Sequence, residues 1–128
     1  IPRLVTPLAS ILYKAATDSL DDEFLQWRDD SAVTVVLAAQ GYPESPKTGG
    51  VVSGIPEISG AQIFHAGTSE EEGSLLSSGG RVLTVTGIGS DLTEARNVAY
   101  RAISQIELAG SFYRSDIAFN ASIAEKGN

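Results

Sequence analysis

The chain has 128 residues, of which 42% are hydrophobic, and a formal net charge of −7 from 16 acidic and 9 basic side chains. That length suits one compact domain, the negative charge argues against a nucleic-acid ligand, and no apolar run approaches the roughly 20 residues that span a membrane. The lack of cysteine excludes disulfides and thiolate metal sites, and the lone His65 excludes an imidazole-rich metal site. Because the sequence shows no export signal, we expect a cytoplasmic protein that has no membrane partner.

The first predicted element is a helix over residues 6–20. Its first residue, a threonine, suits the N-cap, Pro7 suits the first helical position, and an apolar stripe follows at Leu8, Ile11, Leu12 and Ala15. The polar and acidic stretch after this helix is typical of a connector. We therefore expect residues 1–30 to form a helix and connector, and residues 31–128 to form a separate domain.

The next predicted element is a β-strand over residues 32–39, whose β-branched run is apolar on both faces, as in an interior strand. Residues 41–50 are rich in glycine and proline, so we expect an ordered but irregular loop there. Two acidic runs, at residues 21–23 and 70–72, indicate solvated loops rather than a metal site. Shorter strands are predicted over residues 51–53, 61–65, 74–76 and 81–86.

The strongest helical pattern begins at Asp91, which can cap the helix, while Glu94 completes a capping box. Gly110 is placed to end this helix, whose apolar face comprises Ala95, Val98, Ala99, Ala102, Ile103 and Ile106. Residues 112–119 then have strand character, and residues 121–128 are typical of a mobile tail. Several strands with only two main helices favour an α+β domain with a largely antiparallel sheet.

Several side chains are candidates for binding an anionic ligand. Arg81 follows Gly79 and Gly80 at the start of a strand, where its guanidinium could donate paired hydrogen bonds to a phosphate. The alternative is a surface arginine that pairs with one of the many acidic residues. Tyr42 and Lys47 lie in the glycine-rich loop, which either approaches a ligand closely or is an ordinary surface loop.

Two further patterns have a structural explanation beside a functional one. Arg114 and Asp116 are two residues apart, so in a strand they would share a face and could simply pair. The turn over residues 87–89 is similar to a dinucleotide-binding turn, but Asp91 places a carboxylate where the pyrophosphate would lie. The sequence has no nucleophile elbow, histidine–carboxylate metal motif or phosphate loop, so we expect no catalytic residue and no metal ligand in this chain.

Four motifs follow one another along the chain, namely AAQGYP at residues 38–43, FHAGT at 64–68, GGRVLTVT at 79–86 and YRSDI at 113–117. In this order they resemble the phosphoribosylamine–glycine ligases, and the similarity extends from Pro2 to about Ala118. Ser78 and Ala118 depart from the family pattern, which commonly has asparagine and glycine at these two positions.

The resemblance implies an enzyme of the ATP-grasp superfamily, which joins 5-phosphoribosylamine to glycine through a glycyl phosphate at the expense of ATP. It implies that this chain is the C-terminal part of such a ligase, with a barrel-sandwich-like fold. Residues 1–30 would then be the trailing helix and connector of the ATP-grasp portion. ATP and Mg²⁺ or Mn²⁺ would bind to residues of that portion, outside this chain.

The resemblance also implies roles for the cationic residues. Arg81 is the first candidate for the phosphate of phosphoribosylamine, Lys47 and Tyr42 are the second, and Arg114 is the third because Asp116 competes for it. Two alternatives stay open. One is a free-standing carrier of the barrel-sandwich kind, with Lys47 as the modified lysine, and the other is a nucleotide-binding domain built on residues 87–94.

Overall fold

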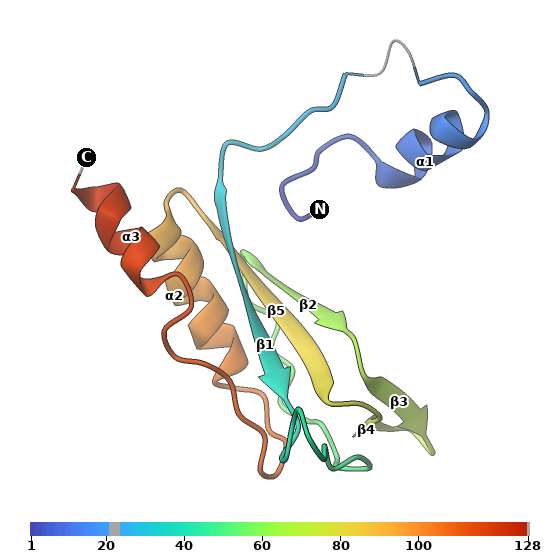
Figure 1. The fold of residues 1–128 in the computed structure, drawn as a ribbon, viewed down its shortest axis with the longest axis vertical. Helices are drawn as coiled ribbons and strands as arrows, with labels where there is room; N and C mark the ends of the chain where they lie inside the picture. The colour runs from blue at the N-terminus through green and yellow to red at the C-terminus, as the bar shows by residue number, and fades with distance from the viewer. Residues whose placement is uncertain (21–23, 128) are drawn as a thin grey trace.

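The computed structural model describes residues 1–20 and 24–127. One helix covers a face of a three-stranded sheet, a second helix packs on the first, and the leading helix stands apart from this body (Figure 1). The elements in chain order are α1 (Leu8–Ala16), β1 (Ser31–Ala38), β2 (Ala61–His65), β3 (Thr68–Glu71), β4 (Ser74–Ser77), β5 (Arg81–Gly89), α2 (Leu92–Ile103) and α3 (Phe119–Lys126).

The main sheet is antiparallel, in the order β1-β5-β2, and β3 and β4 form a separate antiparallel hairpin. These findings confirm the predicted α+β fold with a largely antiparallel sheet, although the described strands do not close into a barrel. The central strand is β5, so the expectation that the strand near residue 32 lies in the sheet interior was wrong. Along β1, Val33 and Val35 are buried while Thr34 and Val36 are exposed, because only one face of this edge strand is covered.

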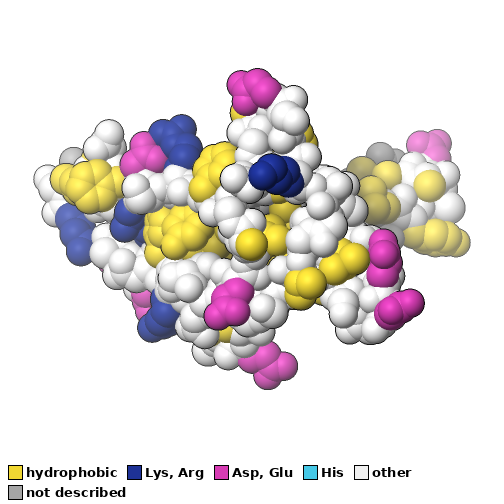
Figure 2. Space-filling view, turned by 90° about the horizontal axis from the view of Figure 1, so that it is seen from below, with side chains coloured by type: hydrophobic (Ala, Val, Ile, Leu, Met, Phe, Trp, Pro, Cys, Tyr) yellow, Lys and Arg dark blue, Asp and Glu magenta, His cyan; other side chains and the backbone are white. Residues whose placement is uncertain are grey.

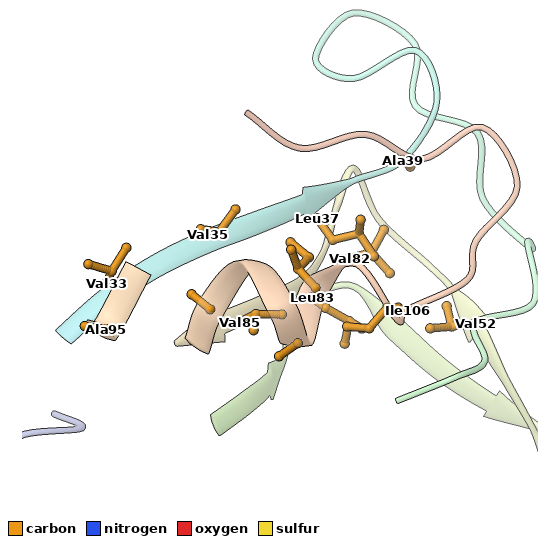
Figure 3. Close-up of a cluster of buried hydrophobic side chains, with 13 residues drawn as sticks. Val33, Val35, Leu37, Ala39, Val52, Val82, Leu83, Val85, Ala95 and Ile106 are labelled. Atoms are coloured by element: carbon orange, nitrogen blue, oxygen red, sulfur yellow. The ribbon is translucent and has the colours of Figure 1, made fainter. Parts of the chain in front are cut away.

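The hydrophobic core lies between the sheet and α2 (Figure 3). Its fully buried members include Val35 and Leu37 from β1, Leu83 and Val85 from β5, and Ile103 from α2. These branched side chains explain why the strands and the helix form where they do, since both patterns direct their apolar residues to one shared layer.

Residues 87–89, which were expected to form a turn, are the last residues of β5, and Gly87 and Gly89 allow α2 to pack on this strand. A β-carbon on Gly87 would stand 2.1 Å from the carbonyl oxygen of Ala95, and one on Gly89 would stand 2.5 Å from the amide nitrogen of the same residue. Only glycine permits this approach. The space beside the backbone that a dinucleotide would have to contact is therefore filled by α2 of the same chain.

The predicted start of α2 is confirmed. Asp91 is the N-cap, and its side chain accepts a hydrogen bond of 2.7 Å from the amide of Glu94. The carboxylate of Glu94 in turn accepts bonds from the amide and the hydroxyl of Ser90, both of 2.7 Å. The predicted end was wrong, because the helix stops at Ile103 and Gly110 lies in a later turn.

Among the shorter strand predictions, residues 61–65 are confirmed as β2, and the last two extend further, to Ser77 and Gly89. Residues 51–53 form only isolated bridges, from Val51 to Leu76 and from Ser53 to Glu107. The acidic run at residues 70–72 is not a loop, since its first two residues belong to β3. The other acidic run, at residues 21–23, lies outside the described residues.

The C-terminal predictions were wrong, because residues 112–119 form no strand beyond one bridge from Phe112 to Ala38, and a helix, α3, replaces the expected tail. Arg96 on α2 explains this outcome. Its guanidinium donates to the carbonyl oxygens of Ser115 and Ile117, at 2.6 and 3.1 Å, and lies over the ring of Phe119, 5.5 Å from its centre. These contacts hold the start of α3 against α2.

The N-terminal helix is shorter than predicted, and Thr6 does not cap it. The hydroxyl of Thr6 instead accepts a hydrogen bond of 2.8 Å from the amide of Gln26, and Pro7 is the N-cap residue. No residue of α1 is buried. None of the helices within the described ranges combines the length and apolar character that crossing a bilayer requires. The division of the chain at residue 30 stays a prediction.

Candidate functional site

A hollow of about 570 Å³ lies where β5 begins, on the face of the sheet that α2 leaves open. It brings together one residue of the glycine-rich loop, the corner before β3, the glycine pair before β5, and side chains of β1 and β5. The residues that line it are Val36, Tyr42, Ala66, Gly67, Gly79, Gly80, Arg81 and Thr84. Arg81 and Tyr42, both predicted as ligand-binding residues, therefore border the same space.

A β-bulge places Arg81 at this hollow. Leu37 pairs with Leu83 and Ala38 pairs with Arg81, so Val82 is an additional residue in β5. In a regular strand Arg81 would share a face with Leu83, which is buried against α2. The additional residue reverses that alternation, so Arg81 shares the open face with Thr84.

The bulge is held by two hydrogen bonds to one oxygen. The amides of Ala66 and Gly67 both donate to the carbonyl oxygen of Val82, at 3.1 and 3.0 Å. The tight corner that results brings Gly67 close to Gly79, since a β-carbon on Gly67 would lie 2.9 Å from the α-carbon of Gly79. The glycines of the motifs FHAGT and GGRVLTVT thus meet at the floor of the hollow.

Arg81 itself is exposed and forms no ion pair or side-chain hydrogen bond with any residue in the described ranges. The alternative of a surface arginine paired with a nearby acidic residue is therefore not what the structure contains. The amides of Gly79 and Gly80 likewise donate no hydrogen bond within the described part of the chain. Arg81 and these two glycines are consecutive residues that line the same hollow, and guanidinium groups and backbone amides are both donors suited to an anion.

The end of the molecule that carries the loops is not uniformly negative. Viewed from below, it presents hydrophobic side chains across its middle, with basic and acidic side chains at separate positions around them (Figure 2). Acidic side chains therefore do not cover this face, although the chain as a whole has a net charge of −7. Local donors can therefore dominate the field that a small ligand experiences at close range.

Lys47 lines a different hollow. This second space, of about 310 Å³, adjoins the other side of the glycine-rich loop and includes Gln40 and Ser77. The amide of Lys47 donates to the carbonyl oxygen of Gln40 at 2.8 Å, which fixes this part of the loop. Lys47 is also not at the tip of the β3–β4 hairpin, where a carrier protein would present its modified lysine. The tip is formed by Glu72 and Gly73.

Arg114 lies outside both hollows. Its guanidinium forms two hydrogen bonds with Asp116, at 2.9 and 2.6 Å, and both side chains are exposed. The hydrogen bonds from Arg114 lower the pKa of Asp116, and the same bonds raise the pKa of Arg114. The two residues pair as the sequence suggested, but in an irregular segment rather than a strand.

Sequence reasoning did not identify the bulge, or the lining residues Val36 and Thr84. The only signal available was position, since Thr84 lies within the motif GGRVLTVT and Val36 lies in the strand that leads into the motif AAQGYP. Within residues 1–20 and 24–127, no group of three or more histidine, aspartate or glutamate side chains is arranged to hold a metal ion.

Comparison with known proteins agrees with this arrangement of motifs. Residues 32–120 match the family model of the phosphoribosylglycinamide synthetase C domain. The phosphoribosylamine–glycine ligase of Streptomyces coelicolor is 50% identical over 127 residues, which cover 94% of this chain and 30% of that protein. The corresponding ligase of Caulobacter vibrioides is 48% identical over 123 residues, or 93% of this chain and 29% of that protein.

Among solved structures, the phosphoribosylamine–glycine ligase of Thermotoga maritima has a TM-score of 0.76 and 37% sequence identity, covering 87% of this chain and 27% of that one. The chain thus spans less than a third of the length of these relatives. Since the family model matches more than half of its residues and its relatives match nearly all of them, this chain belongs to the family of phosphoribosylglycinamide synthetase C domains.

Proposed function

We propose that this chain is the C-terminal part of a ligase that joins 5-phosphoribosylamine and glycine, with ATP converted to ADP and phosphate, to give glycinamide ribonucleotide. In this proposal the hollow beside Arg81 holds the phosphate of phosphoribosylamine. The observation that carries the proposal is the position of Arg81, exposed and without an ion-pair partner in the described chain, next to the available amides of Gly79 and Gly80.

The physical argument concerns the cost of removing a phosphate from water. A phosphate dianion that enters a protein hollow loses hydration, so fixed donors with positive charge must replace it. Arg81 supplies two donors in a planar fork, and the neighbouring amides supply two more without side-chain flexibility. Tyr42 forms a wall of the same hollow and would contact the ligand through its ring or hydroxyl.

Lys47 and Arg114 have weaker support as ligand contacts. Lys47 lines the neighbouring hollow, so only its long side chain would bring its ammonium group to a phosphate beside Arg81. Arg114 is already paired with Asp116 outside that space. We therefore retain Arg81 and Tyr42 as the principal contacts, keep Lys47 as an auxiliary one, and leave Arg114 out.

The nucleotide and the metal ion are proposed to bind outside this chain. When bound, ATP with Mg²⁺ or Mn²⁺ would supply the phosphoryl group that activates glycine. The end of β5 over residues 87–89 does not suit a nucleotide phosphate, because α2 fills the space above its glycines and Asp91 caps the helix. The proposal also includes a cytoplasmic location, where ATP and sugar phosphates are available.

The test is the kinetics of an Arg81→Ala variant in a full-length ligase that contains this domain. Loss of a charged hydrogen bond to phosphate costs about 1.5 to 3 kcal/mol, so the KM for phosphoribosylamine should rise on the order of 10- to 100-fold. The KM for ATP should stay within about twofold. An unchanged KM for phosphoribosylamine would remove Arg81 from the site and with it the proposed role of the hollow.

A further inference from the structure

The hollow extends from Arg81 along the open face of the sheet to Thr84. Thr84 lines it and is half-buried, and its hydroxyl forms no hydrogen bond with another described residue. Its partner across the sheet on β1 is Val36, which is 37% exposed, and its partner on β2 is Phe64. The open face thus presents one hydroxyl between two apolar side chains.

The next hydroxyl on this face is not available to a ligand. Thr86 is only 2% exposed, and its hydroxyl already pairs with that of Thr34 at 2.9 Å. The hydroxyl of Thr84, two residues nearer to Arg81 on the same face, has no such partner among the described residues. A polar group that lines a hollow without a protein partner is suited to bond a ligand.

The spacing of Arg81 and Thr84 fits a small sugar phosphate. Three residues of a strand span about 10 Å at about 3.3 Å per residue, and the bulge at Val82 and the length of the arginine side chain both shorten the gap between the polar groups. A pentose phosphate has its ring hydroxyls within one sugar ring of the phosphate. One molecule could therefore contact both residues.

We propose that Thr84 determines specificity for the sugar by forming a hydrogen bond with a ring hydroxyl of the pentose, while Val36 packs against the apolar part of the ring. This inference rests on the proposed function, because it takes the phosphate to lie at Arg81. It adds an orientation for the ligand. The phosphate lies at the corner where Gly67 meets Gly79, and the sugar lies on the open face of β5 and β1.

The experiment compares Thr84→Val, which removes the hydroxyl at nearly constant shape, with Thr84→Ser, which keeps it. Both are made in a full-length ligase that contains this domain, and Arg81→Ala is measured beside them. We expect Thr84→Val to raise the KM for phosphoribosylamine about 3- to 10-fold, as for one neutral hydrogen bond. Thr84→Ser should stay within about twofold of the unchanged enzyme, and neither variant should change the KM for ATP or the melting temperature.

The outcomes separate this inference from the proposal on which it rests. If Arg81→Ala raises the KM for phosphoribosylamine but Thr84→Val does not, the sugar contact is refuted and the phosphate site remains. If Thr84→Ser is as impaired as Thr84→Val, or if the KM for ATP rises equally, the hydroxyl has a structural role and the inference is refuted. If Arg81→Ala does not change the KM for phosphoribosylamine, the proposed phosphate site in the hollow is itself refuted.

Discussion

Gly80 lies against the ring of Tyr42 so closely that a β-carbon on Gly80 would stand 2.4 Å from the Cδ2 atom of that ring. This contact joins two segments that are far apart in the sequence, the glycine-rich loop after β1 and the start of β5. It fixes one wall of the hollow directly beside Arg81. The position of Tyr42 therefore depends on the absence of a side chain at Gly80.

The first prediction concerns Gly80→Ala. Because the added methyl group must displace the Tyr42 ring, we expect the KM for phosphoribosylamine to rise roughly fivefold, which corresponds to a loss of about 1 kcal/mol in binding free energy. The KM for ATP should be unchanged. The control is the double variant with Tyr42→Ala. If Gly80→Ala acts through Tyr42, it should add little in that background, whereas fully additive effects would show that the contact is not the cause.

The second prediction concerns Ala118, a residue other than glycine with a positive φ. Ala118 has a φ of 58°, in the left-handed region, at the N-cap of α3. Since a side chain there costs about 1 to 2 kcal/mol and glycine gives back part of this through unfolded-state entropy, Ala118→Gly should stabilise the protein by about 0.5 to 1 kcal/mol. Urea unfolding measures this change.

A matched control for that substitution is Ala121→Gly, inside α3, which should destabilise the protein by about 1 kcal/mol at most. Equal destabilisation by both substitutions would contradict the left-handed conformation at Ala118.

The third prediction concerns Arg96, which joins α2 to the segment before α3. Arg96→Ala removes two hydrogen bonds to carbonyl oxygens and the contacts with the rings of Tyr100 and Phe119. We expect a loss of about 2 kcal/mol in the free energy of unfolding. Hydrogen exchange should accelerate selectively in α3. Arg101→Ala, at an exposed position of the same helix, should change stability by less than about 0.5 kcal/mol.

The fourth prediction concerns the pH dependence of the cap of α2. Hydrogen bonds from Ser90 lower the pKa of Glu94 below its ordinary value of 4.5. A group whose pKa is lower in the folded state stabilises the protein above its unfolded pKa, and this contribution is lost as the pH falls through the folded pKa. The difference in stability between the unchanged protein and Glu94→Gln should therefore be present near neutral pH and shrink below pH 4.5.

Unfolding by urea at several pH values measures that difference. A difference that stays constant down to acidic pH would mean that the charge of Glu94 is not involved.

The sequence predicted those parts of the fold that depend on neighbouring residues. The cap formed by Asp91 and Glu94, and the strand at residues 61–65, follow from local patterns, and the structure confirms both. It could not predict α3, because the contact that holds this helix joins Arg96 to a ring 23 residues away. Local propensity gives no information on such contacts.

The site shows the same division. The glycine pair before Arg81 indicated a place where backbone could approach a ligand, but the direction of the Arg81 side chain depends on the register of β1 against β5. One additional residue at Val82 moves Arg81 to the open face, and register is a property of two strands that are distant in the sequence. For the same reason Thr84 was not recognised as a lining residue.

The central claim, that the hollow beside Arg81 binds the phosphate of a sugar phosphate, is tested most directly by calorimetric titration of ribose 5-phosphate into a full-length ligase that contains this domain. We expect Arg81→Ala to weaken binding at least tenfold, as for one charged hydrogen bond, while Arg101→Ala, on the opposite side of the sheet, leaves the Kd unchanged. Equal Kd values for the unchanged enzyme and Arg81→Ala would contradict the claim.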